Sequence, residues 1–325
     1  MFADSMAFIG LQGTPPLFSQ SCRPQLNIAH LTSVPPPVKD FDQALAMHET
    51  FVRDALSNPR VRHLHTRQHV LTLEEDEIGF VFGMQHAPVN MTAQKMRQFR
   101  RAGLQFMAIA YDNPNEYGAG FKGEGSLTSR GQKLIEWMAE NDLILDLSHA
   151  GATTAHEALT FIRSEKLPMK PVASHSASYQ VHQHPRNVRT ELAWEIGMSK
   201  GYVGIPLVTF FLTTQGSDYL GAFVLHLVRT ARFVGGDAVG VGSDCIHCDM
   251  SMRDAEQNFA RMKKMLKTGG SFGEFFPDRP PELIEHGSQT FEILKKYLSR
   301  HLEPNEVAGV CGENFRSYLQ RALPA

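Results

Sequence analysis

Two histidines that follow short apolar runs are the residues of this chain best suited to chemistry. His149 ends the run Leu-Ile-Leu-Asp-Leu-Ser-His, and His175 ends the run Pro-Val-Ala-Ser-His. Runs of this length and composition are typical of buried strands. The carboxyl ends of parallel strands form the edge at which barrel enzymes carry their active sites. Because neutral imidazole is a preferred zinc ligand, the pair predicts a metal site at that edge.

A third apolar run, Ala-Val-Gly-Val-Gly-Ser-Asp, ends at Asp244. Its carboxylate can serve as a third metal ligand, or as the general base that takes a proton from metal-activated water. A bound zinc lowers the pKa of its water towards about 7. Asp146 lies three residues before the first histidine, and we expect it to face a neighbouring strand or helix and to support the site from behind. Together these residues indicate a metallohydrolase, although each alone is compatible with a structural role.

The loop that follows His175 supplies candidates for substrate binding. Arg186 carries a planar guanidinium that can pair with a substrate carboxylate or an oxyanion, and Asn187 lies beside it. We assign both residues to substrate binding. Two further histidines of this loop, His182 and His184, are expected to face solvent.

Strand and helix patterns alternate along most of the chain. Strands are predicted at 78–84, 105–111, 143–149, 171–175, 202–207 and 238–244. Helices are predicted at 40–56, 92–102, 128–140, 154–164, 191–198 and 220–233. Such alternation implies βαβ units and a parallel sheet. The number of units favours a closed (β/α)8 TIM-type barrel over a doubly wound sheet, and no G-x-G-x-x-G fingerprint supports a dinucleotide-binding fold.

The two ends of the chain are less regular. Met1–Gly10 is the candidate first strand, and the proline-rich residues 11–40 are expected to form a loop. Residues 268–283 are predicted to be a long loop over the barrel mouth. Two C-terminal helices are expected to pack against the outside of the barrel, at 283–298 and 304–323. With no repeat and no linker in sight, residues 1–325 are predicted to form a single domain.

The composition describes an ordinary globular protein: 42% of the 325 residues are hydrophobic and 20% are charged. A formal charge of -2 and a pI near 6.7 give no support for a nucleic-acid partner. No apolar run approaches the roughly 20 residues of a membrane helix. Four scattered cysteines are too few for a disulfide framework, and the amino terminus lacks a secretory pattern. We therefore expect a cytoplasmic protein that binds neither nucleic acid nor membrane.

The segment Cys245-Ile-His-Cys248 has the spacing of half a zinc ribbon. A second cysteine pair is absent from the sequence, so thiols on a loop are the favoured interpretation. Because the segment directly follows Asp244, Cys245 or His247 could also reach the active site.

Several motifs, in order from about residue 78 to residue 316, resemble the renal (membrane) dipeptidase family of zinc peptidases. They are Leu127-Thr-Ser-Arg-Gly131, Leu145-Asp-Leu-Ser-His149, Ser174-His-Ser-Ala177, His184-Pro-Arg-Asn-Val188, Gly242-Ser-Asp244 and Gly312-Glu-Asn-Phe-Arg316. The resemblance implies a (β/α)8 barrel that hydrolyses dipeptides, and in some members β-lactam-like amides, with two zinc ions bridged by a glutamate. It also implies a homodimer as one option.

The resemblance assigns roles to particular residues. It places one zinc on His149 and His175 and the other on an N-terminal His-x-Asp pair. It gives the catalytic water to the aspartate at the position of Asp244, and the substrate carboxylate to Arg186.

The chain departs from this family pattern at three places. Met6 and Phe8 stand where the His-x-Asp ligands are expected, and the neutral Gln85 stands where the bridging glutamate is expected. Tyr111 replaces a substrate-contacting histidine, but its hydroxyl can still donate a hydrogen bond to an oxyanion. We therefore assign Tyr111 to catalysis and substrate binding.

Charge decides how many metal ions to expect. Without the bridging carboxylate and the His-x-Asp pair, two neighbouring dications would repel each other strongly. We therefore predict one zinc ion rather than two, held by His149 and His175 and completed by Asp244 and Gln85. His86 is a less favoured substitute, because its side chain should point the other way along the strand.

Three functional hypotheses remain open. The first is a metal-dependent hydrolase of dipeptidase type that cleaves a small amide or dipeptide. The second is a catalytically impaired barrel that binds a small carboxylate ligand through Arg186. The third is a metal-dependent hydrolase that acts on a non-peptide substrate. Turnover of dipeptides that depends on His175 would favour the first hypothesis, and ligand binding without turnover would favour the second.

Overall fold

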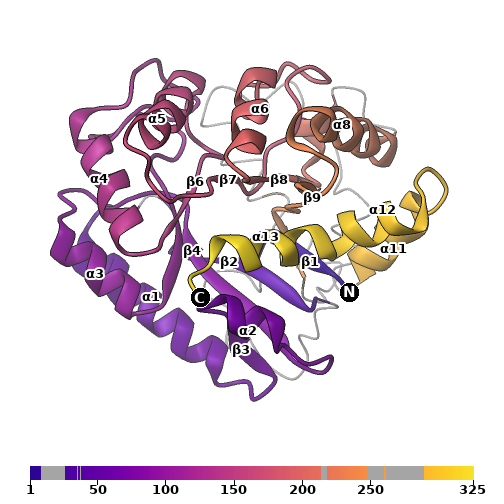
Figure 1. Cartoon of the computed structure of the whole chain (residues 1–325), viewed down its shortest axis with the longest axis horizontal. Helices are drawn as coiled ribbons and strands as arrows, with labels where there is room; N and C mark the ends of the chain where they lie inside the picture. The colour runs from indigo at the N-terminus through magenta and orange to yellow at the C-terminus, as the bar shows by residue number, and fades with distance from the viewer. Residues whose placement is uncertain (9–25, 35, 37, 214–217, 248–259, 261–288) are drawn as a thin grey trace.

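Eight parallel strands form a nearly closed barrel with helices around it (Figure 1). The computed structural model describes residues 1–8, 26–34, 36, 38–213, 218–247, 260 and 289–325. The barrel strands are β1 (Ala3–Phe8), β2 (Ile28–Val34), β4 (Ile78–Met84), β5 (Leu104–Ala108), β6 (Ile144–Asp146), β7 (Val172–Ala173), β8 (Tyr202–Ile205) and β9 (Val239–Val241). They pair in this order, and a short β3 (Val61–His63) pairs with β4 outside it. The predicted (β/α)8 class is confirmed.

The barrel closes at an interrupted strand. The chain leaves the ladder after β9, passes through residues 242–244, and returns as β10 (Cys245–Ile246), which pairs in parallel with β1. At this break the backbone N–H of Asp244 donates to the Met6 carbonyl over 2.9 Å. The Ser5 hydroxyl contacts the carbonyl oxygens of Ser174 (2.6 Å) and Val241 (3.0 Å) across the barrel interior. The closure therefore sits beside the candidate catalytic carboxylate.

Six helices follow the predicted positions closely. They are α1 (Phe41–Leu56), α3 (Ala93–Arg101), α4 (Ser129–Glu140), α5 (Ala152–Ser164), α6 (Thr190–Met198) and α8 (Tyr219–Val234). Shorter or C-terminal helices are α2 (Arg67–Leu71), α7 (Thr209–Leu212), α11 (Thr290–Leu298), α12 (Pro304–Ala308) and α13 (Asn314–Ala322). Asp40, Thr92 and Thr128 cap α1, α3 and α4 through their side-chain oxygens. None of the helices in the described ranges is long and apolar enough to cross a membrane.

The prediction of a loop throughout residues 11–40 was wrong, because residues 28–34 form the central strand β2. Its polar residues concealed the strand, and each of them has a partner inside the barrel. The His30 Nδ1 atom lies 2.8 Å from the Ser5 carbonyl oxygen, and the Ser33 hydroxyl donates to the Gly83 carbonyl over 2.9 Å. The predicted loop at 268–283 and the start of the predicted helix at 283–298 lie outside the described residues.

Helix α13 covers the amino end of the barrel (Figure 1). Its Phe315 and Tyr318 pack against Tyr202, the first residue of β8, with ring centroids 5.3 and 5.5 Å apart. The same apolar cluster contains the first residues of β1, β2, β6 and β7. The C-terminal segment thus closes one end of the barrel, and the carboxyl ends of the strands remain available for ligands.

Gly83 on β4 gives a test of this interior packing. The His30 ring stacks on Phe106 with centroids 4.1 Å apart, and a Cβ on Gly83 would lie 2.2 Å from His30 Nε2 and 2.7 Å from Phe106 Cβ. We expect Gly83→Ala to lower the free energy of unfolding by about 1–3 kcal/mol, because the overpacked core must shift. Gly236→Ala is the matched control, since nothing lies within 4 Å of the position that its Cβ would take. Urea denaturation measures both, and equal stability of the two variants would contradict the described packing.

Candidate metal and substrate site

The loops after β6 and β7 bring two imidazole rings together at the carboxyl end of the barrel. His149 Nε2 and His175 Nε2 lie 3.0 Å apart, and the two residues are only 5% and 1% exposed. Both strands end a few residues earlier than the sequence predicts, so the histidines sit on the first turns of the loops. The ring nitrogens therefore meet above the barrel core.

The far side of each ring is held by a hydrogen-bonded oxygen. His149 Nδ1 lies 3.2 Å from Asp112 Oδ1, and a carboxylate there requires the proton to be on Nδ1. His175 Nδ1 lies 2.7 Å from Ser174 Oγ, whose own hydrogen goes to the Asp146 carboxylate. His175 Nδ1 is therefore also the donor. These contacts leave both Nε2 atoms unprotonated and 3.0 Å apart.

An N–H of Arg186 lies 3.2 Å from His149 Nε2 and donates to it, since a guanidinium group has no acceptor. Burial holds the pKa of His149 and of His175 well below the usual range, and the Arg186 cation lowers both further. Both rings are therefore neutral near pH 7. Zinc–nitrogen bonds are about 2.0–2.1 Å long, so two nitrogens 3.0 Å apart can share one ion. The two imidazoles therefore fit one zinc ion.

The residues expected for a second ion do not fit one. Met6 is fully buried, and its sulfur accepts hydrogen bonds from Gln85 Nε2 and Thr32 Oγ1, both over 3.3 Å. Gln85 therefore directs its amide nitrogen at the Met6 sulfur. An amide N–H and a thioether neutralise no charge on a divalent cation. Across the described part of the chain, no group of three His, Cys, Asp or Glu side chains is arranged to hold a metal.

Asp244 occupies a strained position at the break between β9 and β10. Its φ of 57° lies in the left-handed region, which costs a non-glycine residue roughly 1–2 kcal/mol. Burial raises the pKa of its carboxyl to about 7, although the Arg186 cation works in the opposite direction. A carboxyl that titrates near neutrality suits a general base. Among the described residues, no hydrogen bond or ion pair joins Asp244 to His149 or His175.

A buried carboxylate positions Asp244, and the sequence reasoning missed it. Asp4, on β1, accepts hydrogen bonds from the Ser243 backbone N–H (2.8 Å) and from the Ser243 hydroxyl. Its Oδ2 also lies 2.7 Å from His247 Nε2. Asp146 holds the serine before His175 in the same way, through its backbone N–H and its hydroxyl. The sequence does contain a pattern that could have revealed these contacts. A serine directly precedes both His175 and Asp244, and Asp4 and Asp146 each lie within an apolar run.

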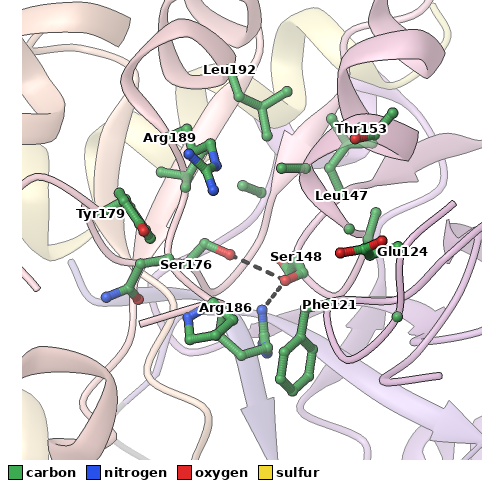
Figure 2. Close-up of a pocket in the computed structure, with 18 of the residues that line it drawn as sticks. Phe121, Glu124, Leu147, Ser148, Thr153, Ser176, Tyr179, Arg186, Arg189 and Leu192 are labelled. Atoms are coloured by element: carbon green, nitrogen blue, oxygen red, sulfur yellow. Dashed lines mark hydrogen bonds between the residues drawn. The ribbon is translucent and has the colours of Figure 1, made fainter. Parts of the chain in front are cut away.

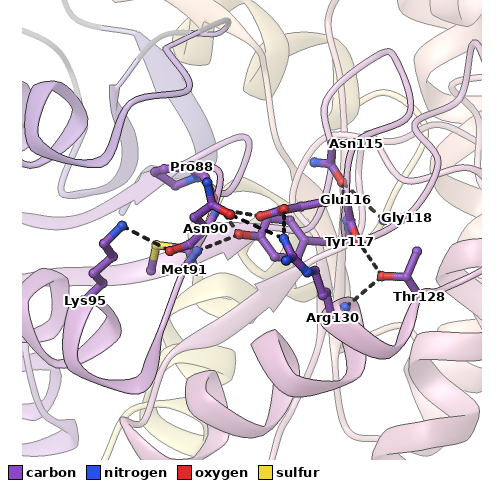
Figure 3. Close-up of polar contacts among 11 residues, drawn as sticks. Pro88, Asn90, Met91, Lys95, Asn115, Glu116, Tyr117, Gly118, Thr128 and Arg130 are labelled. Atoms are coloured by element: carbon purple, nitrogen blue, oxygen red, sulfur yellow. Dashed lines mark hydrogen bonds and ion pairs between the residues drawn. The ribbon is translucent and has the colours of Figure 1, made fainter.

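The loop that follows β5 forms one wall of the site. Figure 3 shows the contacts that hold it against the starts of α3 and α4. The Tyr117 hydroxyl donates to the Pro88 carbonyl (2.7 Å) and accepts from the Met91 N–H (2.9 Å), and Glu116 pairs with Arg130. This network fixes the residues on either side of it, including the tyrosine next to the histidine pair.

That tyrosine, Tyr111, stacks on the His149 ring with centroids 3.9 Å apart and planes 25° apart. Burial raises its pKa above the usual range, so the phenol stays protonated and can donate a hydrogen bond.

Arg186 lies against the histidine pair and is 4% exposed. Its guanidinium lies 5.6 Å from the Phe121 ring centroid and 5.2 Å from that of Phe211, and Nη2 is 3.2 Å from His149 Nε2. Nη1 donates to the Ser148 carbonyl. Burial lowers the pKa of Arg186, and the Asp244 charge acts in the opposite direction. No carboxylate of the described residues lies close enough to Arg186 to form an ion pair with it. A buried guanidinium without a paired carboxylate favours binding of an anion.

Three sequence expectations about neighbouring residues can be compared with the structure. The expectation that His184 faces solvent was wrong: it is buried, its ring lies 4.9 Å from that of Phe211, and burial lowers its pKa to about 3. His182 is half-buried. His86 Nε2 contacts the Val38 carbonyl. Cys245 is a buried free thiol, while the second cysteine of that segment lies outside the described residues.

A cavity of about 390 Å³ lies beside Arg186, between the amino ends of α5 and α6 (Figure 2). Ser148 and Ser176 contribute to its wall. Asn187 also lines it, and its Nδ2 donates to the carbonyl oxygens of His182 (2.9 Å) and Phe211 (2.7 Å). The asparagine thus braces its own loop while it lines the cavity.

Solved structures share this architecture. An amidohydrolase from Pseudomonas aeruginosa superposes with a TM-score of 0.79 at 19% identity, covering 99% of this chain and 96% of that one. A metallopeptidase from Rhodobacter sphaeroides, liganded with a phosphinate mimic of the dipeptide L-Ala-D-Ala, superposes with a TM-score of 0.68 at 18% identity, covering 91% and 87%. At these identities the likeness shows the fold alone.

Curated relatives are dipeptidases by name. The dipeptidase aclJ of Aspergillus oryzae is 27% identical over 230 residues, covering 69% of this chain and 46% of that protein. An uncharacterized dipeptidase of Schizosaccharomyces pombe is 28% identical over 167 residues, covering 48% and 38%. The chain thus spans less than half the length of these two relatives.

The sequence model that describes the membrane dipeptidase family, peptidase family M19, matches residues 25–271, which is most of the chain. The match includes the two histidine-ended runs, the Arg186 loop and Asp244, and it confirms the resemblance that the motifs indicate. The chain belongs to the membrane dipeptidase family.

Proposed function

We propose that this chain hydrolyses a small amide or dipeptide with the help of one zinc ion held by His149 and His175. The observation that carries the proposal is the pair of neutral imidazoles whose unprotonated Nε2 atoms face each other at 3.0 Å. Family membership supports the reaction class. When bound, zinc supplies a Lewis acid and a water molecule of lowered pKa.

Residues of the chain carry out proton transfer, stabilisation of the carbonyl oxygen and substrate binding. Asp244 accepts a proton from the attacking water and returns it to the leaving amine, which its raised pKa favours. The Tyr111 hydroxyl donates a hydrogen bond to the oxygen that gains charge at the scissile carbonyl. Arg186 pairs with the substrate carboxylate, and Asn187 is available as a neighbouring hydrogen-bond acceptor. Asp112 keeps His149 in the tautomer that leaves Nε2 unprotonated.

The second candidate function is a barrel that binds a small carboxylate without turnover. It is favoured by Met6 and Gln85, whose mutual hydrogen bond occupies the place of the ligands to a second ion. A non-peptide amide is the alternative substrate for the same single-ion site.

We also propose a compartment, an oligomeric state and a domain organisation. The buried free thiols Cys245 and Cys311 support a reducing compartment, so we propose a cytoplasmic protein. Trp194 and Met198, 52% and 66% exposed on α6, would offer apolar surface to a homodimer. We further propose that residues 1–325 form a single domain.

Metal content tests the single-ion site. After incubation with zinc and desalting, we expect one equivalent of zinc per chain by plasma mass spectrometry. His149→Ala and His175→Ala should each lose it, because one imidazole cannot hold the ion alone. His301→Ala, at an exposed imidazole, is the matched control and should retain it. Two equivalents in the unmodified protein would refute the single-ion prediction.

Turnover tests the reaction. A panel of L,L- and L,D-dipeptides with added Zn²⁺, Co²⁺ or Mn²⁺ should show hydrolysis that His175→Ala abolishes. Asp244→Asn should lower kcat about 10²–10⁴-fold, because it removes the proton acceptor. Arg186→Gln should raise KM for free dipeptides but not for the corresponding C-terminal amides. Thermal stabilisation by dipeptides without any turnover would support the binding function instead.

The buried histidines predict acid sensitivity of the metal-free protein. Burial lowers the pKa of His48 and His226 to about 4, and also depresses those of His149 and His175. Below pH 6.5 the unfolded chain gains protons that the native state does not, so the free energy of unfolding falls. Each such histidine contributes roughly 1.4 kcal/mol per pH unit.

Asp244 acts in the opposite direction, because its native pKa of about 7 exceeds the ordinary value of 3.8. As the pH falls from 7 towards 4, the native state holds one proton that the unfolded chain lacks, which offsets one histidine. Urea denaturation at pH 5.0 to 7.0 measures the slope. His226→Gln should reduce the slope, provided the variant folds, and His301→Gln should leave it unchanged. A flat profile in the unmodified protein would contradict the neutral, buried histidines.

A further inference from the structure

The cavity between α5 and α6 carries charged groups that the proposed reaction does not use. Arg189 enters it from one side and Glu124 from the other, with Arg186 and Ser148 below them (Figure 2). The Arg189 guanidinium lies 4.6 Å from the centroid of the Tyr179 ring, which holds it over the opening. We call this cavity the α5–α6 recess.

The α5–α6 recess is positive. It contains two guanidinium groups and one carboxylate, and no described acidic side chain lies within ion-pair distance of Arg186 or Arg189. The amino end of α5 adds to this field: its N-cap residue is Gly151, so no side chain caps the first backbone N–H groups, and Ala152 and Thr153 of the first turn line the recess. Such an environment favours an anionic group.

A buried acceptor in the recess suits an occupant that carries a hydrogen-bond donor, such as an N–H group. Asn187 is 5% exposed, and its Oδ1 has no hydrogen-bond partner among the residues that the structure describes. An unpaired buried oxygen is unfavourable unless a ligand donates to it. A group with two carboxylates and an N–H, such as an acidic residue at the end of a peptide, satisfies Asn187 and both arginines.

The α5–α6 recess is joined to the histidine pair through one side chain. Arg186 lines the recess, and its Nη2 lies 3.2 Å from His149 Nε2. Arg186 therefore contacts both the histidine pair and the recess, so a peptide that binds at the pair would extend towards the recess.

We propose that the α5–α6 recess selects substrates with an acidic C-terminal residue, Arg186 binding the main-chain carboxylate and Arg189 the side-chain carboxylate. This inference rests on the proposed dipeptidase function. Glu124, on the opposite wall, disfavours a second negative charge and so sets the strength of the preference.

Kinetics with matched dipeptides test the preference. We expect KM for Ala-Glu to be about tenfold below KM for Ala-Gln, which has the same shape without the charge. Arg189→Gln should raise KM for Ala-Glu about tenfold and leave Ala-Ala unchanged, and Glu124→Gln should lower KM for Ala-Glu. Arg163→Gln, an exposed arginine in the last turn of α5, is the matched control. Equal effects of Arg189→Gln on Ala-Glu and Ala-Ala would overturn the proposal.

A binding measurement separates the recess from the reaction. N-acetyl-L-glutamate carries both carboxylates and an N–H, and calorimetry should show that it binds more tightly than N-acetyl-L-glutamine, with the difference lost in Arg189→Gln. This result without any dipeptide turnover would uphold the recess and refute the dipeptidase function. Turnover of dipeptides with equal binding of the two probes would uphold the function and refute the recess.

Discussion

The approach of two unprotonated imidazole nitrogens to 3.0 Å is the contact on which the rest of the site depends. Hydrogen bonds on the far side of each ring hold the two nitrogens in this position. Asp112 holds one ring, and the Ser174–Asp146 pair holds the other. Burial removes the protons that would otherwise compete for the nitrogens. The arrangement leaves two unprotonated nitrogens side by side, which is the geometry that the proposed zinc ion would need.

Buried carboxylates do this positioning at two places in the barrel wall. Asp146 joins β6 to the serine before His175, and Asp4 joins β1 to the serine before Asp244. Each carboxylate accepts a backbone N–H and a hydroxyl from the next strand, so its charge is satisfied without water. The second of these contacts also lies at the closure of the barrel, so the fold and the position of Asp244 depend on the same hydrogen bonds.

Charge explains why Met6 and Gln85 do not suit a second metal ion. A second dication needs carboxylates to neutralise it, and here Met6 and Gln85 bind each other instead. Positive charge beside the histidine pair comes from the buried guanidinium of Arg186, which is held between two phenyl rings. The proposed single ion and this fixed guanidinium would together polarise a carbonyl and anchor a carboxylate.

The sequence by itself determined the barrel and the strand ends that His149 and His175 follow, because apolar runs with polar ends and alternating helices are local patterns. It failed at β2, where His30 and Ser33 look solvent-exposed until their partners across the barrel are known. Only the tertiary structure decided that Gln85 turns to Met6, that His184 is buried, and that Asp4 supports Asp244. Those contacts join residues as much as 239 positions apart, and the pairing of strands that creates them leaves no mark in any short stretch of sequence.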